Sequence, residues 1–265
     1  MIRSTFRWVI GFSFASLALA AEGAAVPDAV LLDRIGLRVK QVWDDFSTVT
    51  CTENLTQEKF NEKGKVVLAS RANFDYLIAL RWNGNDLLVD ESRLEVGPPR
   101  KKRPEGALLA TRGFATMLLI LHPDFQSSFY LTSLPDEDDS GRKLAPVAFV
   151  HRDAARSPGV LELKGREYPI AWEGTAWIDR ATAMVVRVQA HWKEPAEEIG
   201  LEELSSDVRY GPVSLGSNRT YWLPESALIE VKTRHQHWRN SHQFTHYRLF
   251  SVESDSKVEE TKKQP

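Results

Sequence analysis

The hydrophobic pattern of this chain predicts one amphipathic helix followed by a long series of strands. After Pro27-Asp28, apolar residues recur at three- and four-residue intervals, the spacing of one helical face. Lys40, Asp44 and Asp45 are expected on the solvent side. The apolar face consists of Leu32, Ile35, Val39, Val42 or Trp43, and Phe46. We therefore predict an N-terminal helix that docks onto an apolar surface.

Strict alternation of apolar and polar residues begins after this helix. The segment "NFDYLIALRW" places Phe74, Tyr76, Ile78, Leu80 and Trp82 on one face of a strand. The sequence "NGND" at 83–86 is a strong hairpin signal, because Asn and Gly tolerate the positive φ of a tight turn. A second turn is expected at "NEKGK", around Gly64. Strands at 48–60, 65–82 and 87–94 should therefore form a meander.

Further strands are expected along the rest of the chain, about 127–134, 145–151, 160–163, 170–179, 184–192, 208–214, 221–238 and 242–253. In 184–192, Met184, Val186 and Val188 share a face. The apolar run 107–121 predicts a second, buried helix ended by Pro123. Residues 194–207 read as an acidic loop or a short surface helix.

About ten strands without alternating helices predict an antiparallel sheet. The fold class is therefore mainly β (α+β): a single strongly curved antiparallel sheet, a half-barrel. The N-terminal amphipathic helix and the second helix pack in its concave face. We expect one such domain over 21–255 and a disordered tail over 256–265, where the charged sequence lacks periodicity.

The first twenty residues have the pattern of a signal peptide. Arg3 and Arg7 precede an apolar run from Trp8 to Ala20 that closes with small residues, which favours cleavage before Ala21. An uncleaved anchor is the alternative, but the run is shorter than the roughly 20 residues that a span needs. We therefore predict a signal peptide at 1–20 and a periplasmic protein.

Charge and cysteine content narrow the classes of partner. Without Arg3 and Arg7 the chain has 32 basic and 36 acidic side chains, which gives no reason to expect a nucleic-acid partner. The single Cys51 excludes an internal disulfide. The basic run "GPPRKKRPEG" at 97–106 is a solvated loop or a transient contact with anionic lipid headgroups at a membrane surface. We expect a monomer.

Familiar catalytic motifs are absent from the sequence. The chain contains no Gly-x-Ser-x-Gly elbow, no phosphate-cradling glycine loop and no His-Glu-x-x-His helix. We therefore expect no enzymatic activity and no cofactor.

A cluster of histidines leaves one chemical alternative open. In "TRHQHWRNSHQFTH", a turn at Asn240-Ser241 sets His235 opposite His246 and His237 opposite Phe244. This register would place His235, His237 and His246 on one face as a zinc site. The alternative is a polar rim where the sheet leaves the core.

Four pieces of sequence together resemble a known superfamily. They are a signal peptide followed by an amphipathic helix, "VTCTENLTQEKFNEKGK…FDYLIA", "GTAWIDRATAMVVRVQAHW", and "YWLPESALIEVK…THYRLFSV". Their order resembles the outer-membrane lipoprotein carrier (LolA/LolB-like) superfamily, above all its uncharacterised, longer exported members. The resemblance implies a periplasmic half-barrel with helices closing its open mouth. It also implies an acyl chain or another apolar ligand bound in the concave face.

Three functions remain open from the sequence. The first is a binding or carrier protein for a lipid or a lipoprotein acyl chain. The second is a metal-dependent hydrolase that uses the histidine cluster, and the third is an envelope interaction protein with a filled core. The candidate ligand-facing residues are Phe74, Tyr76, Ile78, Leu80, Trp82, Leu118, Met184, Val186, Val188 and Phe250.

Overall fold

The computed structural model describes residues 27–83, 86–97, 114–163, 166–194, 200–216 and 219–250. The predicted signal peptide, the predicted tail at 256–265 and most of the basic run at 97–106 lie outside these residues. In chain order the elements are α1 (Ala29–Phe46), β1 (Val49–Phe60), β2 (Val66–Asn83), β3 (Asp86–Glu95), the 3₁₀ helix η1 (Phe114–Leu121), α2 (Pro123–Gln126), β4 (Phe129–Ser133), β5 (Glu137–Asp139), β6 (Arg142–His151), β7 (Val160–Leu163), β8 (Arg166–Pro169), β9 (Trp172–Asp179), β10 (Val185–Trp192), β11 (Leu201–Leu215), β12 (Arg219–Thr233) and β13 (Gln236–Leu249).

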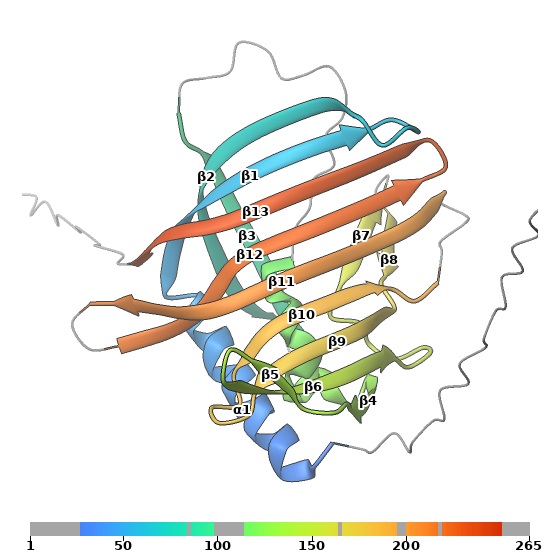
Figure 1. The fold of residues 1–265 in the computed structure, drawn as a ribbon. Coiled ribbons are helices and arrows are strands. Elements are labelled where there is room, and N and C mark those ends of the chain that lie inside the picture. Colours follow the sequence, from blue (N-terminus) through green and yellow to red (C-terminus); the bar gives the residue numbers. More distant parts are fainter. Residues whose placement is uncertain are drawn as a thin grey trace, which may run out of the picture.

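One curved antiparallel sheet dominates the fold. Its strand order is β3-β2-β1-β13-β12-β11-β10-β9-β6-β4, with β5 paired to β6, while β7 and β8 form a separate hairpin. The first and last long strands are neighbours, because β1 pairs with β13. Helix α1 and η1 lie behind the sheet in Figure 1, on its concave side. The predicted fold class is confirmed: an open antiparallel half-barrel with helices in its concave face.

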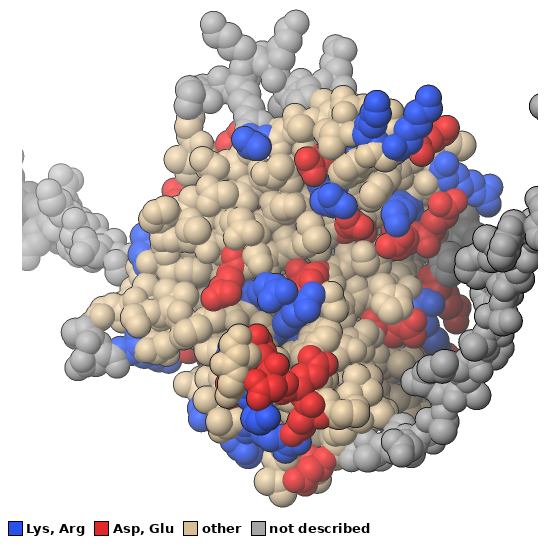
Figure 2. Space-filling model, viewed as in Figure 1, with Lys and Arg blue, Asp and Glu red and all other residues tan. Residues whose placement is uncertain are grey.

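The outer, convex face of the sheet is polar. Figure 2 shows acidic and basic side chains mixed across this face. Many of them pair across strands: Arg187 Nε donates to Asp207 Oδ1 at 2.8 Å, and Arg239 Nε donates to Glu230 Oε1 at 2.6 Å. The buried side of the sheet is therefore the side that faces the helices.

Helix α1 forms as the sequence predicts. Asp28 caps it by accepting a hydrogen bond from Val30 N at 3.0 Å. Its buried face includes Ile35, which is fully buried. Leu32 is only partly buried, and Leu31 joins the core beside it. The expectation that Asp45 faces solvent is wrong: this carboxylate is buried and pairs with Arg219 of β12.

The predicted second helix differs from the structure. The described part of 107–121 is the 3₁₀ helix η1, and residues 107–113 lie outside the described part of the chain. Pro123 does not end this element; it opens the short helix α2, where the ring fixes φ at a value suited to a first turn. His122 caps α2, since its Nδ1 accepts from Asp124 N at 3.3 Å.

The segment 194–207 also differs from its prediction. From Leu201 onward it is the start of β11, whereas 195–199 lie outside the described residues. Leu204, Ser206 and Val208 alternate inward along this strand, and the acidic residues Glu202 and Glu203 are exposed or half-buried. The charge of the segment therefore reflects its solvent-facing positions. None of the described helices is both long and apolar enough to cross a membrane.

Gly174 is required where β9 meets β10. A Cβ added there would lie 2.0 Å from the carbonyl oxygen of Gln189 and 2.9 Å from Ala190 Cα, both main-chain atoms. We expect Gly174→Ala to lower the free energy of unfolding by about 1–3 kcal/mol, because the backbone of β10 must shift to admit the methyl group. Urea unfolding followed by fluorescence measures this. The neighbouring Thr175→Ala is the control, and equal stability of the two variants would contradict the packing argument.

Candidate functional site

Strand pairing aligns side chains in rows across the concave face. One row consists of buried apolar residues on β6, β9, β10, β11 and β12, namely Val147, Ala176, Val188, Val208 and Ala227. A parallel row on the same strands consists of Phe149, Gly174, Ala190, Ser206 and Ile229. We call this region, defined by these ten residues, the apolar half of the concave face.

Polar residues enter both rows on β13. The first continues from Ala227 to His242 and then to the apolar Leu55, and the second from Ile229 to Asn240 and then Gln57. On β1, Glu53 takes an inward position two residues before Leu55, and on β3 Glu91 and Arg93 face inward opposite Ile78 and Tyr76. We call the region defined by Glu53, Tyr76, Glu91, Arg93, Asn240 and His242 the polar half. The concave face is thus amphipathic.

The helices cover the apolar half. η1 contacts β10, β11 and β12, and α1 contacts η1, β12 and β2. The phenol of Tyr210, buried on β11, holds η1 in place: it donates to Ala115 O at 3.1 Å and accepts from Leu118 N at 3.2 Å. We call α1 and η1 together the cover. Apolar packing and a few hydrogen bonds hold this cover on the sheet.

Helix α1 is attached to the sheet by polar contacts near both ends. Arg34 Nη2 donates to Ala181 O at 2.9 Å, and Arg38 Nε donates to Thr182 O at 3.3 Å. Both carbonyls belong to the turn between β9 and β10, which Asp179 Oδ1 shapes by accepting from Thr182 N at 2.9 Å. At the other end Asp45 pairs with Arg219. These contacts orient the helix over the apolar half.

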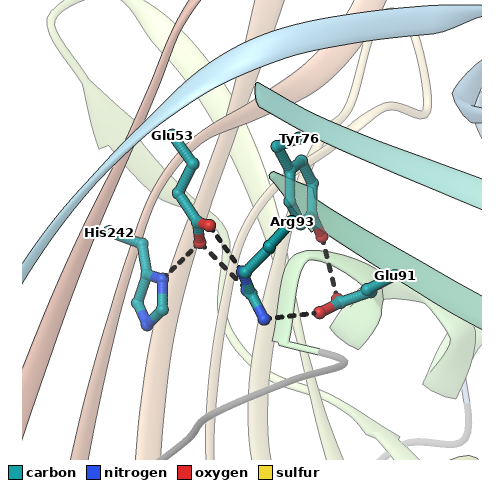
Figure 3. A network of polar contacts seen from close by, with 5 residues as sticks. All are labelled: Glu53, Tyr76, Glu91, Arg93 and His242. Carbon is teal, nitrogen blue, oxygen red and sulfur yellow. Dashed lines mark hydrogen bonds and ion pairs between the residues drawn. The ribbon is translucent and has the colours of Figure 1, made fainter. Parts of the chain in front are cut away.

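A connected network of charged groups occupies the polar half (Figure 3). Arg93 lies between two carboxylates: its Nε is 2.5 Å from Glu53 Oε2, its Nη2 is 2.9 Å from Glu53 Oε1, and its Nη1 is 3.1 Å from Glu91 Oε2. His242 Nδ1 lies 2.6 Å from Glu53 Oε1, and Tyr76 donates to Glu91 Oε1 at 2.8 Å. The five residues come from β1, β2, β3 and β13, which are neighbours in the sheet.

The network fixes the charge of Glu53 despite complete burial. Burial alone would raise the pKa of the Glu53 carboxyl, but hydrogen bonds from His242 and Arg93 outweigh it and hold that pKa below 4.5. Because an ionised carboxylate only accepts hydrogen bonds, His242 Nδ1 carries a proton toward it. Burial raises the pKa of Tyr76 well above 10.0, so this phenol stays neutral and donates to Glu91.

A small cavity lies between Phe46, the last residue of α1, and Tyr76 of the polar half. Its volume is about 10 Å³, room for about one water molecule. Tyr76 belongs both to the cavity and to the charged network, since it lines the cavity and its hydroxyl group donates to Glu91. The lining residues are Phe46, Val49, Thr50, Cys51, Tyr76, Ile78, Leu223, Pro224 and Tyr247. A ligand larger than water therefore needs movement of the cover.

The candidate ligand-facing residues fall into different positions. Tyr76, Ile78, Leu118 and Val188 are buried in the core, and Phe74 is half-buried opposite Glu53. The side chains of Leu80 and Trp82 lie outside the described part of β2. Phe250 is 47% exposed and follows the end of β13, so its expected inward position is wrong.

A β-bulge changes the inward face of β10. Val185 pairs with Ile178, but Arg187 pairs with Trp177, so the register shifts between them. Val185 is consequently buried, whereas Val186 and Met184 are only half-buried. The predicted common face of Met184, Val186 and Val188 is wrong for this reason, and only Val188 keeps its inward position.

The histidine cluster is arranged differently from the zinc hypothesis. The turn between β12 and β13 is at Arg234-His235, because Thr233 pairs with Gln236 and Val231 with Trp238. Asn240-Ser241 lies within β13, opposite Ile229 and Leu228. The predicted register is therefore wrong, and His235 does not face His246 across a hairpin.

The three histidines of the predicted metal site consequently have different surroundings. His235 is exposed in the turn, His237 stacks on Phe60 with ring centroids 4.7 Å apart, and His246 sits at a bulge with φ 51°. Within the described ranges, no three His, Cys, Asp or Glu side chains gather closely enough to hold a metal ion. The buried histidine of the cluster is His242, which belongs to the polar half.

Sequence reasoning missed the charged network. A signal was present in the alternation: Glu53 has the same parity as Val49, Cys51 and Leu55, so it falls on the buried side of β1. Glu91 and Arg93 likewise share parity on β3. Alternation alone does not show the strand pairing that brings these residues and His242 together.

The described residues form an open half-barrel with helices in its concave face, and some solved structures are similar to this chain. No family model and no curated protein matches the sequence. A DUF1329 family protein from Desulfovibrio piger is similar over 88% of this chain and 97% of its own, at 12% identity and a TM-score of 0.44.

Two further similar structures carry names from the superfamily that the sequence resembles. A LolA superfamily protein from Nitrosomonas europaea covers 82% of this chain and 94% of its own, at 8% identity and a TM-score of 0.37. A putative outer membrane lipoprotein-sorting protein domain from Vibrio parahaemolyticus covers 84% and 94%, at 11% identity and a TM-score of 0.41.

Proposed function

We propose that this chain is a periplasmic binding or carrier protein that takes up an apolar ligand, a lipid or a lipoprotein acyl chain, in the apolar half of its concave face. It acts by binding and carries out no catalysis. The signal-peptide pattern at 1–20 supports export, and the continuous apolar rows under α1 and η1 supply the surface that an acyl chain needs.

One observation favours a binding face over a permanently filled core. Trp43 Nε1 of α1 and Ser206 Oγ of β11 are buried, and neither has a hydrogen-bond partner among the described residues. Each such group costs about 1–3 kcal/mol in a dry core. Both belong to the region between cover and sheet, where a ligand with an ester or amide group would satisfy them.

Uptake requires the cover to move, and the contacts of α1 provide the test. We expect the double variant Arg34→Ala/Arg38→Ala to take up an uncharged fluorescent acyl probe about fivefold faster than the unmodified protein. Removing two exposed hydrogen bonds weakens the closed state by about 1 kcal/mol in total, which is a factor of about five in the open population. Stopped-flow fluorescence measures the rate.

Lys40→Ala is the matched control. Lys40 lies on the same helix but pairs with Asp44 one turn away, so its removal should leave uptake unchanged. Equal acceleration by both substitutions would show that the turn contacts do not hold the cover. Failure of the unmodified protein and the double variant alike to bind the probe would contradict the carrier function itself.

A further inference from the structure

The polar half is an unusual feature of a face that otherwise buries apolar residues. Glu53 has a fully buried side chain, and Glu91, His242 and Arg93 are 3%, 2% and 16% exposed. A buried ion-pair network is weak evidence for added stability, because apolar residues of similar size often serve the core as well. Its place in the face therefore calls for another role.

Basic and acidic side chains alternate along the chain of contacts in the network. The order is His242, Glu53, Arg93, Glu91 and then the neutral Tyr76. Two carboxylates face one guanidinium and one imidazole, and these side chains satisfy one another by contact. If a lipid headgroup with a net charge entered this network, one buried charge would be left without its counterion, which is costly. A head that carries one charge of each sign would replace each broken ion pair by a new one.

The network reaches the end of α1 through the cavity. Tyr76 and Phe46 of α1 both line that cavity, and the hydroxyl group of Tyr76 donates to Glu91. Phe244 extends this junction, since its ring lies 5.3 Å from that of Tyr76 and 6.3 Å from that of His242. An amphiphile with its chain under α1 would therefore have its head at the network.

We propose that the polar half is a headgroup subsite for an amphiphile with a zwitterionic ammonium–phosphate head. The ammonium group pairs with Glu91 and the phosphate with Arg93 and His242. This inference rests on the proposed function, because it names the class of ligand whose chain occupies the apolar half.

Displacement of the uncharged acyl probe by single-chain lipids of equal chain length tests the proposal. We expect lysophosphatidylethanolamine to displace the probe at a concentration at least tenfold lower than lysophosphatidylglycerol or monoacylglycerol. Soluble glycerophosphoethanolamine, which has the head without the chain, should displace nothing. In Glu91→Gln the preference for lysophosphatidylethanolamine over monoacylglycerol should fall to less than threefold.

Asp75→Asn is the matched control, since Asp75 lies on the opposite face of β2 and pairs with Arg248. Should Glu91→Gln fail to fold, Tyr76→Phe removes the hydrogen bond to Glu91 and should reduce the same preference. Equal displacement by all three lipids, or a preference for the anionic one, would overturn the headgroup proposal and leave the carrier function standing. Displacement by the soluble head alone would also overturn it, and absence of any probe binding removes both proposals.

Discussion

Replacement of Glu53 by alanine is expected to lower the free energy of unfolding by about 3–5 kcal/mol. The carboxylate binds Arg93 and His242 at once, and both partners are largely buried. Its loss leaves a guanidinium without one of its two acceptors and an imidazole without its hydrogen-bond partner, and both of these side chains are largely buried. Urea unfolding at neutral pH, followed by circular dichroism, measures the difference.

Asp75→Ala provides the comparison for this variant. Asp75 is also a carboxylate that binds an arginine, with Oδ1 at 2.8 Å from Arg248 Nη2, but the two side chains are 44% and 53% exposed. An exposed pair of this kind contributes about 0–1 kcal/mol. If Glu53→Ala and Asp75→Ala lower the free energy of unfolding equally, burial does not increase the contribution of the network to stability.

The pH dependence of stability in the unmodified protein and in Glu53→Ala supplies an independent check. The pKa of Glu53 is lowered below 4.5 in the folded state, so its contribution is fully present above 4.5. That contribution is lost as pH falls through the folded-state pKa, because the protonated carboxyl no longer forms the same contacts with Arg93 and His242. The stability difference between the unmodified protein and Glu53→Ala should therefore shrink in acid. A constant difference from neutral pH to well below 4.5 would be inconsistent with an ionised Glu53.

Ile35→Ala should produce the second large effect, a loss of about 2–5 kcal/mol. Ile35 is fully buried at the centre of α1, in contact with the core that η1 and the sheet form. Truncation removes apolar contacts and leaves a cavity beneath the helix. Urea unfolding measures the stability, and hydrogen exchange reports whether α1 opens before the sheet does.

Leu37→Ala is the control on the same helix. Leu37 is 69% exposed on the opposite face, and its truncation should change stability by no more than about 0.5 kcal/mol. A comparable loss in both variants would mean that α1 is not docked as the structure has it. Loss of exchange protection in α1 alone, with the strands still protected, would identify the helix as a separately opening cover and support the carrier mechanism.

Local patterns gave a correct account of most elements. Recurrence at three and four residues located α1, and alternation with the "NGND" turn located β2 and β3, whose ends Asn83 and Asp86 pair across a two-residue loop. The antiparallel half-barrel followed from many strands without intervening helices. These signals are local in the sequence, so a single chain suffices to identify them.

Charged segments were harder to interpret. Residues 201–207 carry several acidic side chains and still form the start of β11, because their buried positions hold Leu204 and Ser206. Asp45 has the residue type of a solvent-facing position, yet Arg219 from β12 makes its burial possible. For Asp45 the partner that decides the outcome lies far away in the chain.

By itself, the sequence determined that this chain forms a helix and then an antiparallel sheet with one apolar face, because the periods of 3.6 and 2 residues are local properties. Tertiary structure alone decided the register. The bulge at β10 exchanged Val186 for Val185, the turn at Arg234-His235 separated the histidines, and pairing of β3, β2, β1 and β13 assembled Glu53, Arg93 and His242. The physical reason is that a shift of one residue turns every side chain to the other face, and only the packed sheet selects among such shifts.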